Sequence, residues 1–102
     1  MPQFLILAYD GTDADAPARR QAVRPRHFAN IAPMVERGEF KAAGAILDDF
    51  GTMVGSVIFT DFATRQKLDA WLADEPYVRE GVWQRVEVKP FRLAVLDGKV
   101  TQ

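Results

Sequence analysis

The chain predicts an α+β fold in which two helices cover one face of a four-stranded antiparallel sheet. Two observations carry this prediction. Four apolar runs have the length of strands, and two longer segments repeat apolar residues at helical spacing. These segments alternate in the order β-α-β-β-α-β, which with right-handed crossovers most economically gives a ferredoxin-like sandwich. At 102 residues the chain can bury one core, so we expect a single domain over 1–102, with a polar tail at 97–102.

Two of the expected strands suggest that the sheet is covered on both sides. The strands are predicted at residues 3–9, 39–47, 53–61 and 82–91. Gln3–Tyr9 and Met53–Asp61 carry apolar residues on both faces, which is typical of covered strands. The two helices can cover one face only, and a bare apolar sheet does not stay exposed to water. We therefore expect a second copy of the chain to cover it, giving a homodimeric α+β barrel.

The strand at 39–47 differs from the others because small residues fill its centre. The run Ala42-Ala43-Gly44-Ala45 leaves room for a ligand above the sheet, or for close packing of a helix, and both interpretations stay open. Asp48 and Asp49 follow it. Turn formation explains this pair better than a metal site, because no further ligand stands at a suitable spacing.

The first helical segment, residues 14–37, contains three prolines. Pro17 suits the start of a helix, whereas Pro25 and Pro33 would each remove a hydrogen bond from its interior. We therefore expect breaks or kinks at Pro25 and Pro33, and a helix end at Gly38. The second helix is expected at 61–74.

The stretch around His27 is the main candidate for function. His27 is the only histidine of the chain, and histidine titrates near neutral pH. At helical spacing it shares the apolar face of Val23, Ile31 and Met34, so it points toward the body of the protein. Arg24 lies at the edge of the same face. A histidine on an apolar face is more often a hydrogen-bonded structural residue than a catalyst, so the rest of the chain must decide.

Composition excludes several classes of function. The net charge is −1 and the basic residues are not clustered, which argues against nucleic acid as a partner. The absence of cysteine removes disulfides and thiol nucleophiles and fits a reducing compartment. No apolar run has the length of a membrane span and no signal peptide is evident, so we expect a soluble cytoplasmic domain without membrane contact. No glycine-rich phosphate loop or ligand cluster is present, so we expect neither cofactor nor metal.

Several short motifs stand out along the chain. They are the strand end Tyr9-Asp10, Arg24-Pro25-x-His27, the small-residue strand at Gly44, Gly55-Ser56, Trp71-x-x-Asp74-x-Pro76-Tyr77-x-x-x-Gly81-Val82, and Val88-Lys89-Pro90-Phe91. In this order they resemble the YciI-like family. The resemblance runs from about residue 3 to about residue 93. It implies a ferredoxin-like fold, a dimer related to the muconolactone isomerases, and a pocket with a histidine–aspartate pair. By position, these residues are His27 and Asp74.

This chain departs from the family pattern in two places. Glu75 stands where an aspartate or a small residue is common, and the loop at 48–52 is shorter than in many members. A shorter loop would leave the pocket more open and change the size of substrate that it admits. Characterised relatives include a dehydrochlorinase that acts on a chlorinated aromatic compound, and many members have no assigned reaction. The resemblance therefore implies a fold and a site more firmly than a substrate.

A His27–Asp74 pair would support acid–base chemistry. The carboxylate would accept the Nδ1 proton and leave Nε2 as a base, suited to proton abstraction, elimination or isomerisation on a small aromatic or lactone-like substrate. The residues expected to bind this substrate are Arg24, Ser56, Tyr9, Tyr77 and Trp83. The alternative is a dimeric binding domain without turnover, in which the pair only ties the two helices together. A cofactor-free monooxygenase rests on fold analogy alone.

Overall fold

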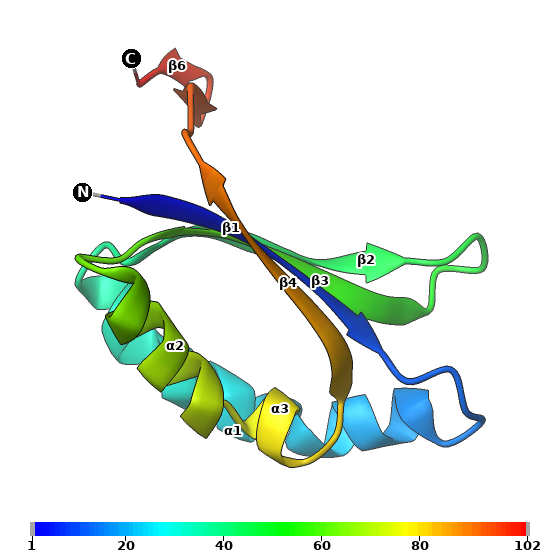
Figure 1. The fold of residues 1–102 in the computed structure, drawn as a ribbon. Helices are drawn as coiled ribbons and strands as arrows, with labels where there is room; N and C mark the ends of the chain where they lie inside the picture. The colour runs from blue at the N-terminus through cyan, green and yellow to red at the C-terminus, as the bar shows by residue number, and fades with distance from the viewer. Residues whose placement is uncertain (1, 102) are drawn as a thin grey trace.

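A computed structural model describes residues 2–101 (Figure 1). Its elements are β1 (Gln3–Asp10), α1 (Ala16–Glu36), β2 (Phe40–Leu47), β3 (Met53–Asp61), α2 (Arg65–Asp74), α3 (Pro76–Arg79), β4 (Trp83–Phe91), β5 (Val95–Leu96) and β6 (Lys99–Val100). Strands β1 to β4 form one antiparallel sheet in the order β2-β3-β1-β4. All three helices lie on the same side of it (Figure 1). The predicted ferredoxin-like sandwich is confirmed.

The core lies between this sheet and the helices. Burial alternates along β1, where Phe4, Ile6 and Ala8 are buried and their neighbours are half-buried. The strand register places Ile58 beside Ile6, and both side chains are almost fully enclosed. This period of two is what a strand with one face on the core requires.

The opposite face of the sheet carries no helix (Figure 1). Leu5, Leu7 and Tyr9 of β1 point to this side and are half-buried. Phe59 and Phe91 reach across the same face, with ring centroids 5.3 Å apart. The apolar residues expected on both faces of the sheet are therefore present, and one of these faces is open within residues 2–101.

Helix α1 continues through two prolines, so of the breaks or kinks predicted at Pro25 and Pro33 the breaks are wrong. Both prolines lie on the exposed side of the helix. Water can therefore solvate the carbonyl groups that lose their helical partners, and the buried side of α1 keeps the segment helical. Pro17 lies in the first turn, and Gly38 follows the helix with φ of 76°, both as predicted. No helix within residues 2–101 is long and apolar enough to cross a membrane.

Helix α2 begins later than predicted and ends where predicted. Thr64 is extended, and its hydroxyl accepts a hydrogen bond from Lys67 N at 3.1 Å, so this N-cap sets the start at Arg65 and not at residue 61. Pro76 keeps Glu75 extended, with ψ of 126°. Glu75 is thus the single residue between α2 and α3.

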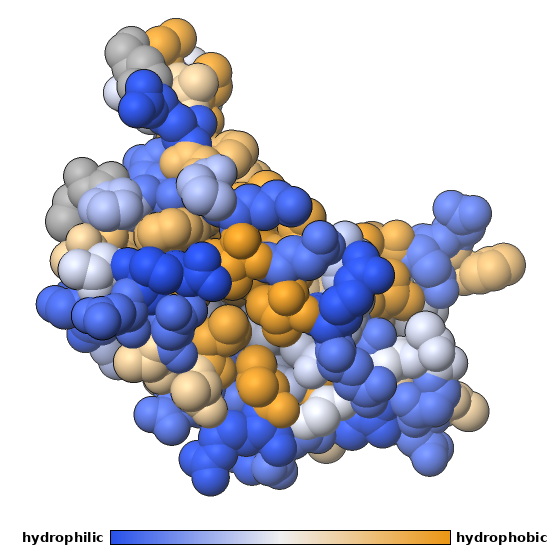
Figure 2. Space-filling model, viewed as in Figure 1, coloured by the Kyte–Doolittle hydropathy of each residue, from blue (hydrophilic) through white to orange (hydrophobic). Residues whose placement is uncertain are grey.

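The predicted polar tail is a β-hairpin over most of its length. β5 and β6 pair across Asp97-Gly98, whose φ angles of 53° and 73° are those of a tight hairpin turn. The Asp-Gly signal for this turn stands in the sequence. The hairpin rises on the open side of the sheet and stands clear of the body (Figures 1 and 2). Val95 and Val100 on it are 56% and 74% exposed.

The turn between β2 and β3 is closed by Asp48, as turn chemistry predicts. Its Oδ1 accepts hydrogen bonds from Phe50 N at 2.9 Å and from Thr52 N at 3.0 Å. Phe50 at the tip is 95% exposed.

Candidate functional site

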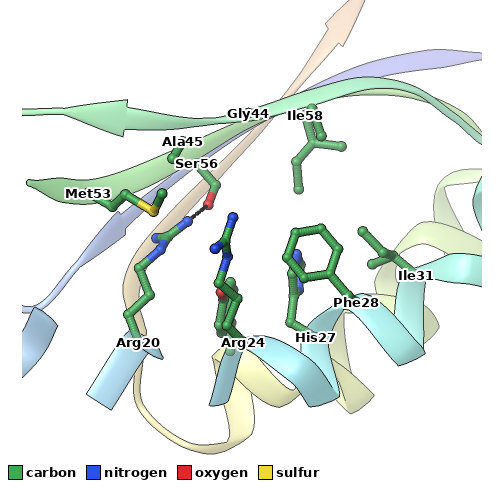
Figure 3. Close-up of a pocket in the computed structure, with 12 residues that line it drawn as sticks. Arg20, Arg24, His27, Phe28, Ile31, Gly44, Ala45, Met53, Ser56 and Ile58 are labelled. Carbon is green, nitrogen blue, oxygen red and sulfur yellow. Dashed lines mark hydrogen bonds between the residues drawn. The ribbon is translucent and has the colours of Figure 1, made fainter. Parts of the chain in front are cut away.

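A cavity of about 180 Å³ lies between α1 and the edge of the sheet formed by β2 and β3 (Figure 3). The residues that line it are Arg20, Arg24, His27, Phe28, Ile31, Ala43, Gly44, Ala45, Met53, Ser56, Ile58 and Tyr77. The small residues of β2 form its roof. The space above this strand is therefore a pocket, and no helix within residues 2–101 packs closely against it.

His27 is held in the wall of this pocket by Glu75. Its Nδ1 forms a short hydrogen bond with Glu75 Oε1, and both side chains are buried. Glu75 also accepts bonds from Asn30 Nδ2 at 2.7 Å and Tyr77 N at 3.3 Å. An ionised carboxylate only accepts, so a ring that faces an ionised Glu75 donates from Nδ1. With Nδ1 engaged in this way, a neutral ring can take up a proton only at Nε2.

Two aromatic rings fix the orientation of the imidazole. Tyr77 stacks on His27 with centroids 4.1 Å apart and an interplanar angle of 10°. Trp83 meets the imidazole edge-on at 5.6 Å. Burial raises the pKa of the Tyr77 hydroxyl. The two ring contacts hold the plane of the imidazole in place.

A second polar network lies deeper, at the end of β1. Arg20 donates to both carboxylate oxygens of Asp10, at 2.9 and 3.0 Å, and to Ser56 Oγ at 2.9 Å. Trp83 Nε1 donates to the same hydroxyl at 3.2 Å. Burial raises the pKa of the Asp10 carboxyl, and the bonds from Arg20 offset part of that rise. The network links the sheet to α1 beside the pocket.

Arg24 enters the pocket from α1, one turn before His27. Its guanidinium carbon lies 5.1 Å from the centre of the Phe28 ring. Figure 3 shows the side chain rising from the helix toward the strand that carries Ser56, beside Arg20. Arg24, Ser56 and Tyr77 thus line one pocket with His27, where the sequence predicted substrate-binding residues.

Asp74 does not face His27, which corrects the predicted pair. Asp74 is exposed and lines a separate groove with Lys67 and Trp71. The physical reason is Pro76: Asp74 is the last residue of α2, and the chain then turns so that the next side chain, Glu75, points inward.

Two other predicted site residues lie elsewhere. Tyr9 is on the open face of the sheet, where Arg85 lies 4.4 Å above its ring, because odd-numbered residues of β1 point away from the helices. Trp83 does not line the cavity and lies behind it, in contact with His27 and Ser56. Tyr9 is therefore not part of the pocket, and Trp83 supports it from behind.

The sequence analysis missed Glu75, Arg20 and Asn30. A signal for Arg20 was available, because it stands seven residues before His27 and continues the buried stripe of α1. The expected break at Pro25 concealed it. Glu75 stands directly before a proline, where the direction of the chain changes and helical spacing no longer predicts which side a residue faces.

Similar sequences match most of the chain. The model of the YCII-related domain matches residues 2–92. Protein YciI of Escherichia coli is 32% identical over 95 residues, which is 87% of this chain and 97% of the relative. A protein of Haemophilus influenzae is 34% identical over 80 residues, which is 72% of this chain and 82% of that one.

Among solved structures, a 5-chloro-2-hydroxyhydroquinone dehydrochlorinase from Burkholderia phenoliruptrix, in complex with 2,5-dihydroxybenzoquinone, is similar with a TM-score of 0.76. It is 18% identical, and the match covers 88% of this chain and 93% of that one. A dimeric ferredoxin-like protein from Jannaschia matches with a TM-score of 0.52 at 13% identity, over 91% of this chain and all of that one. The family model covers most of the chain, and the relatives exceed 30% identity. The chain therefore belongs to the YCII-related domain family.

Proposed function

We propose that the pocket is the active site of an enzyme that needs no cofactor and performs proton abstraction, elimination or isomerisation on a small ring compound. One observation supports this most directly: Glu75 holds His27 Nδ1, which leaves Nε2 of a buried, stacked imidazole as a base in a cavity. The carboxylate that pairs with His27 in this proposal belongs to Glu75 and not to Asp74.

The chemical step needs no group beyond these residues. His27 Nε2 takes a proton from the substrate, and the electron pair of the broken bond forms a new double bond. In an elimination the leaving group departs with its own bonding electrons, and the imidazolium then releases its proton to water. In an isomerisation the imidazolium returns its proton to another atom of the substrate. The Glu75 carboxylate stabilises the imidazolium formed in between. A positioned base of this kind typically contributes ~10²–10⁴-fold in rate.

The size of the cavity suits one ring. A dry protein cavity of about 150 Å³ can hold benzene, and this pocket has about 180 Å³. The similar dehydrochlorinase is bound to 2,5-dihydroxybenzoquinone, a single ring with oxygen substituents. A substituted aromatic or lactone-like ring is thus the substrate class we propose, with Arg24, Ser56 and Tyr77 as the binding residues.

We further propose that the protein acts as a homodimer in the cytoplasm. The open apolar face of the sheet, with Leu5, Leu7 and Phe59, is the surface on which a second copy would pack. A cysteine-free chain fits a reducing compartment.

The test is chloride release from 5-chloro-2-hydroxyhydroquinone by four proteins: the wild type, His27→Gln, Glu75→Gln and Asp74→Asn. We expect His27→Gln to lower kcat by about 10²-fold or more and Glu75→Gln to lower it less, because the amide can still accept from Nδ1 but cannot neutralise the imidazolium. Asp74→Asn is the matched control and should keep the wild-type rate. Ring-proton exchange in deuterated water, followed by NMR, extends the test to non-chlorinated rings.

The result that contradicts the proposal is a rate that survives in His27→Gln. If the wild type binds such rings but neither releases chloride nor exchanges protons, the chain is a binding domain and the His27–Glu75 pair is structural.

A further inference from the structure

Toward a ligand, the hydroxyl of Ser56 can act only as a hydrogen-bond donor. Its oxygen accepts from Arg20 Nη2 at 2.9 Å and from Trp83 Nε1 at 3.2 Å. A hydroxyl has two acceptor lone pairs and one donor proton, so both lone pairs are used. No acceptor for the proton lies within hydrogen-bonding distance among residues 2–101. Ser56 is 5% exposed and lines the pocket, so its O–H can serve an acceptor atom of a bound molecule.

The two arginines of the pocket differ in charge balance. Arg20 is neutralised by Asp10, with side-chain exposures of 5% and 3%. Arg24 is half-buried, and no carboxylate lies within salt-bridge distance of it among the described residues. Its contact is the face of Phe28. A partly desolvated guanidinium with no acid partner favours an anion in front of it.

We propose that Ser56 and Arg24 form an oxyanion subsite, and that the substrate is a planar ring carrying one negatively charged oxygen group. The shared chemistry is a delocalised oxyanion, either a carboxylate or the oxygen of a phenolate or enolate. This inference deepens the proposed function of the same pocket and rests on it. It assigns Ser56 as a donor and Arg24 as the charge partner, which together define the substrate class.

The position of the subsite suits the chemistry of His27. His27 and Arg24 rise from α1, and Ser56 lies across the cavity on β3 (Figure 3). The substrate already carries a negative charge, and removal of a proton by Nε2 increases it. A fixed donor and a cation beside the oxygen group hold the ring in the pocket and offset the added charge.

The roof leaves room for a ring. Ala43 and Ala45 of β2 line the cavity, and their side chains are only methyl groups. Their register partners on β3 are Ile58 and Ser56. A planar ring can thus enter under the edge strand while its oxygen reaches Ser56.

Binding of benzoate, 4-nitrophenolate and benzamide tests the subsite without any turnover. The single histidine gives one set of imidazole signals, so NMR titration of His27 reports occupancy directly. We expect at least one of the two anions to bind the wild type about tenfold or more tighter than the neutral, nearly isosteric benzamide. The tighter-binding anion of the two, benzoate or 4-nitrophenolate, shows whether the subsite prefers a carboxylate or a phenolate.

Two pairs of variants locate the effect. Arg24→Met should weaken binding of the anion about 10- to 100-fold, the usual range for a hydrogen bond to a charged group, and leave benzamide unchanged. Arg26→Met removes an exposed cation of the same helix, paired with Glu80, and should leave both affinities unchanged.

Ser56→Ala should weaken the anion about tenfold. Thr60→Val is its control, because Thr60 is also a buried hydroxyl of β3 but donates to the carbonyl of Phe4, at 2.9 Å. If Ser56→Ala unfolds because Arg20 and Trp83 lose their acceptor, the Arg24 pair still decides the charge preference.

Equal binding of anions and benzamide overturns the subsite, and so does an equal loss in Arg24→Met and Arg26→Met. The proposed function fails differently, through a rate that survives in His27→Gln. Anion binding without turnover would support the subsite and contradict the proposed enzymatic activity.

Discussion

Glu75 joins the two short helices and also binds the histidine of the pocket. It ends α2, its side chain accepts from Tyr77 N at the start of α3, and it holds His27 and Asn30. A fully buried carboxylate is stable only when its oxygens are satisfied in this way. Its neighbour Asp74 has the same charge and none of these contacts.

Replacing Glu75 should therefore cost stability, whereas replacing Asp74 should not. Glu75→Ala leaves the donors of His27, Asn30 and Tyr77 without their acceptor, and we expect the free energy of unfolding to fall by about 2–4 kcal/mol. Asp74→Ala removes an exposed acid and should change it by about 0.5 kcal/mol or less. Urea unfolding followed by far-UV circular dichroism measures both. A similar loss in the two variants would contradict the role given to Glu75.

Helix α1 shows where local rules and tertiary packing compete. Pro25 and Pro33 each predict a break, but the helix continues through both. The buried stripe from Arg20 through His27 to Met34 packs on one side, while the prolines lie on the other. Each proline costs the helix one backbone hydrogen bond, but this loss does not end the helix.

Removing one of these prolines should stabilise the helix. Pro25→Ala restores an internal hydrogen bond, and we expect the free energy of unfolding to rise by about 1–3 kcal/mol, less the gain in freedom of the unfolded chain. Pro17→Ala is the control, because a proline in the first turn removes no bond, and it should be neutral or slightly destabilising. Thermal and urea unfolding compare the two. An unchanged or lowered stability of Pro25→Ala would show that packing already compensates the proline.

The sequence could predict elements better than their exact neighbours. Apolar periodicity placed the four strands of the sheet and both long helices, because burial imposes a period of two or 3.6 residues. It placed His27 on the buried side of α1 for the same reason. It could not choose between Asp74 and Glu75, since the answer depends on a turn of the chain at Pro76. Tyr9 was misplaced because β1 is apolar on both faces.

At the scale of the molecule, the sheet has two unlike faces. One is covered by the helices (Figure 1) and holds the pocket at its edge. The other carries aliphatic and aromatic residues, and no helix within residues 2–101 packs on them. Phe59 and Phe91 form a ring pair there. A surface of this kind is typical of a protein interface.

A charge on this face should prevent association. We expect the wild type to sediment as a dimer at micromolar concentration and Phe59→Asp to sediment as a monomer, because an aspartate would be buried without a partner. Phe50→Asp changes the same residue type at the exposed turn after β2 and should remain dimeric. Analytical ultracentrifugation over a range of concentrations measures this. A wild type that stays monomeric at every concentration would contradict the proposed dimer.

The hairpin of β5 and β6 gives a second view of the same event. An isolated two-stranded hairpin is marginally stable in water, and this one rises beside the open face of the sheet (Figure 1). In a free chain its backbone amides should exchange with deuterium almost as fast as in a short peptide. If a second copy packs against it, exchange at Lys99 and Val100 should slow as protein concentration rises. The end of the chain would then report, by its rate of hydrogen exchange, when two molecules have met.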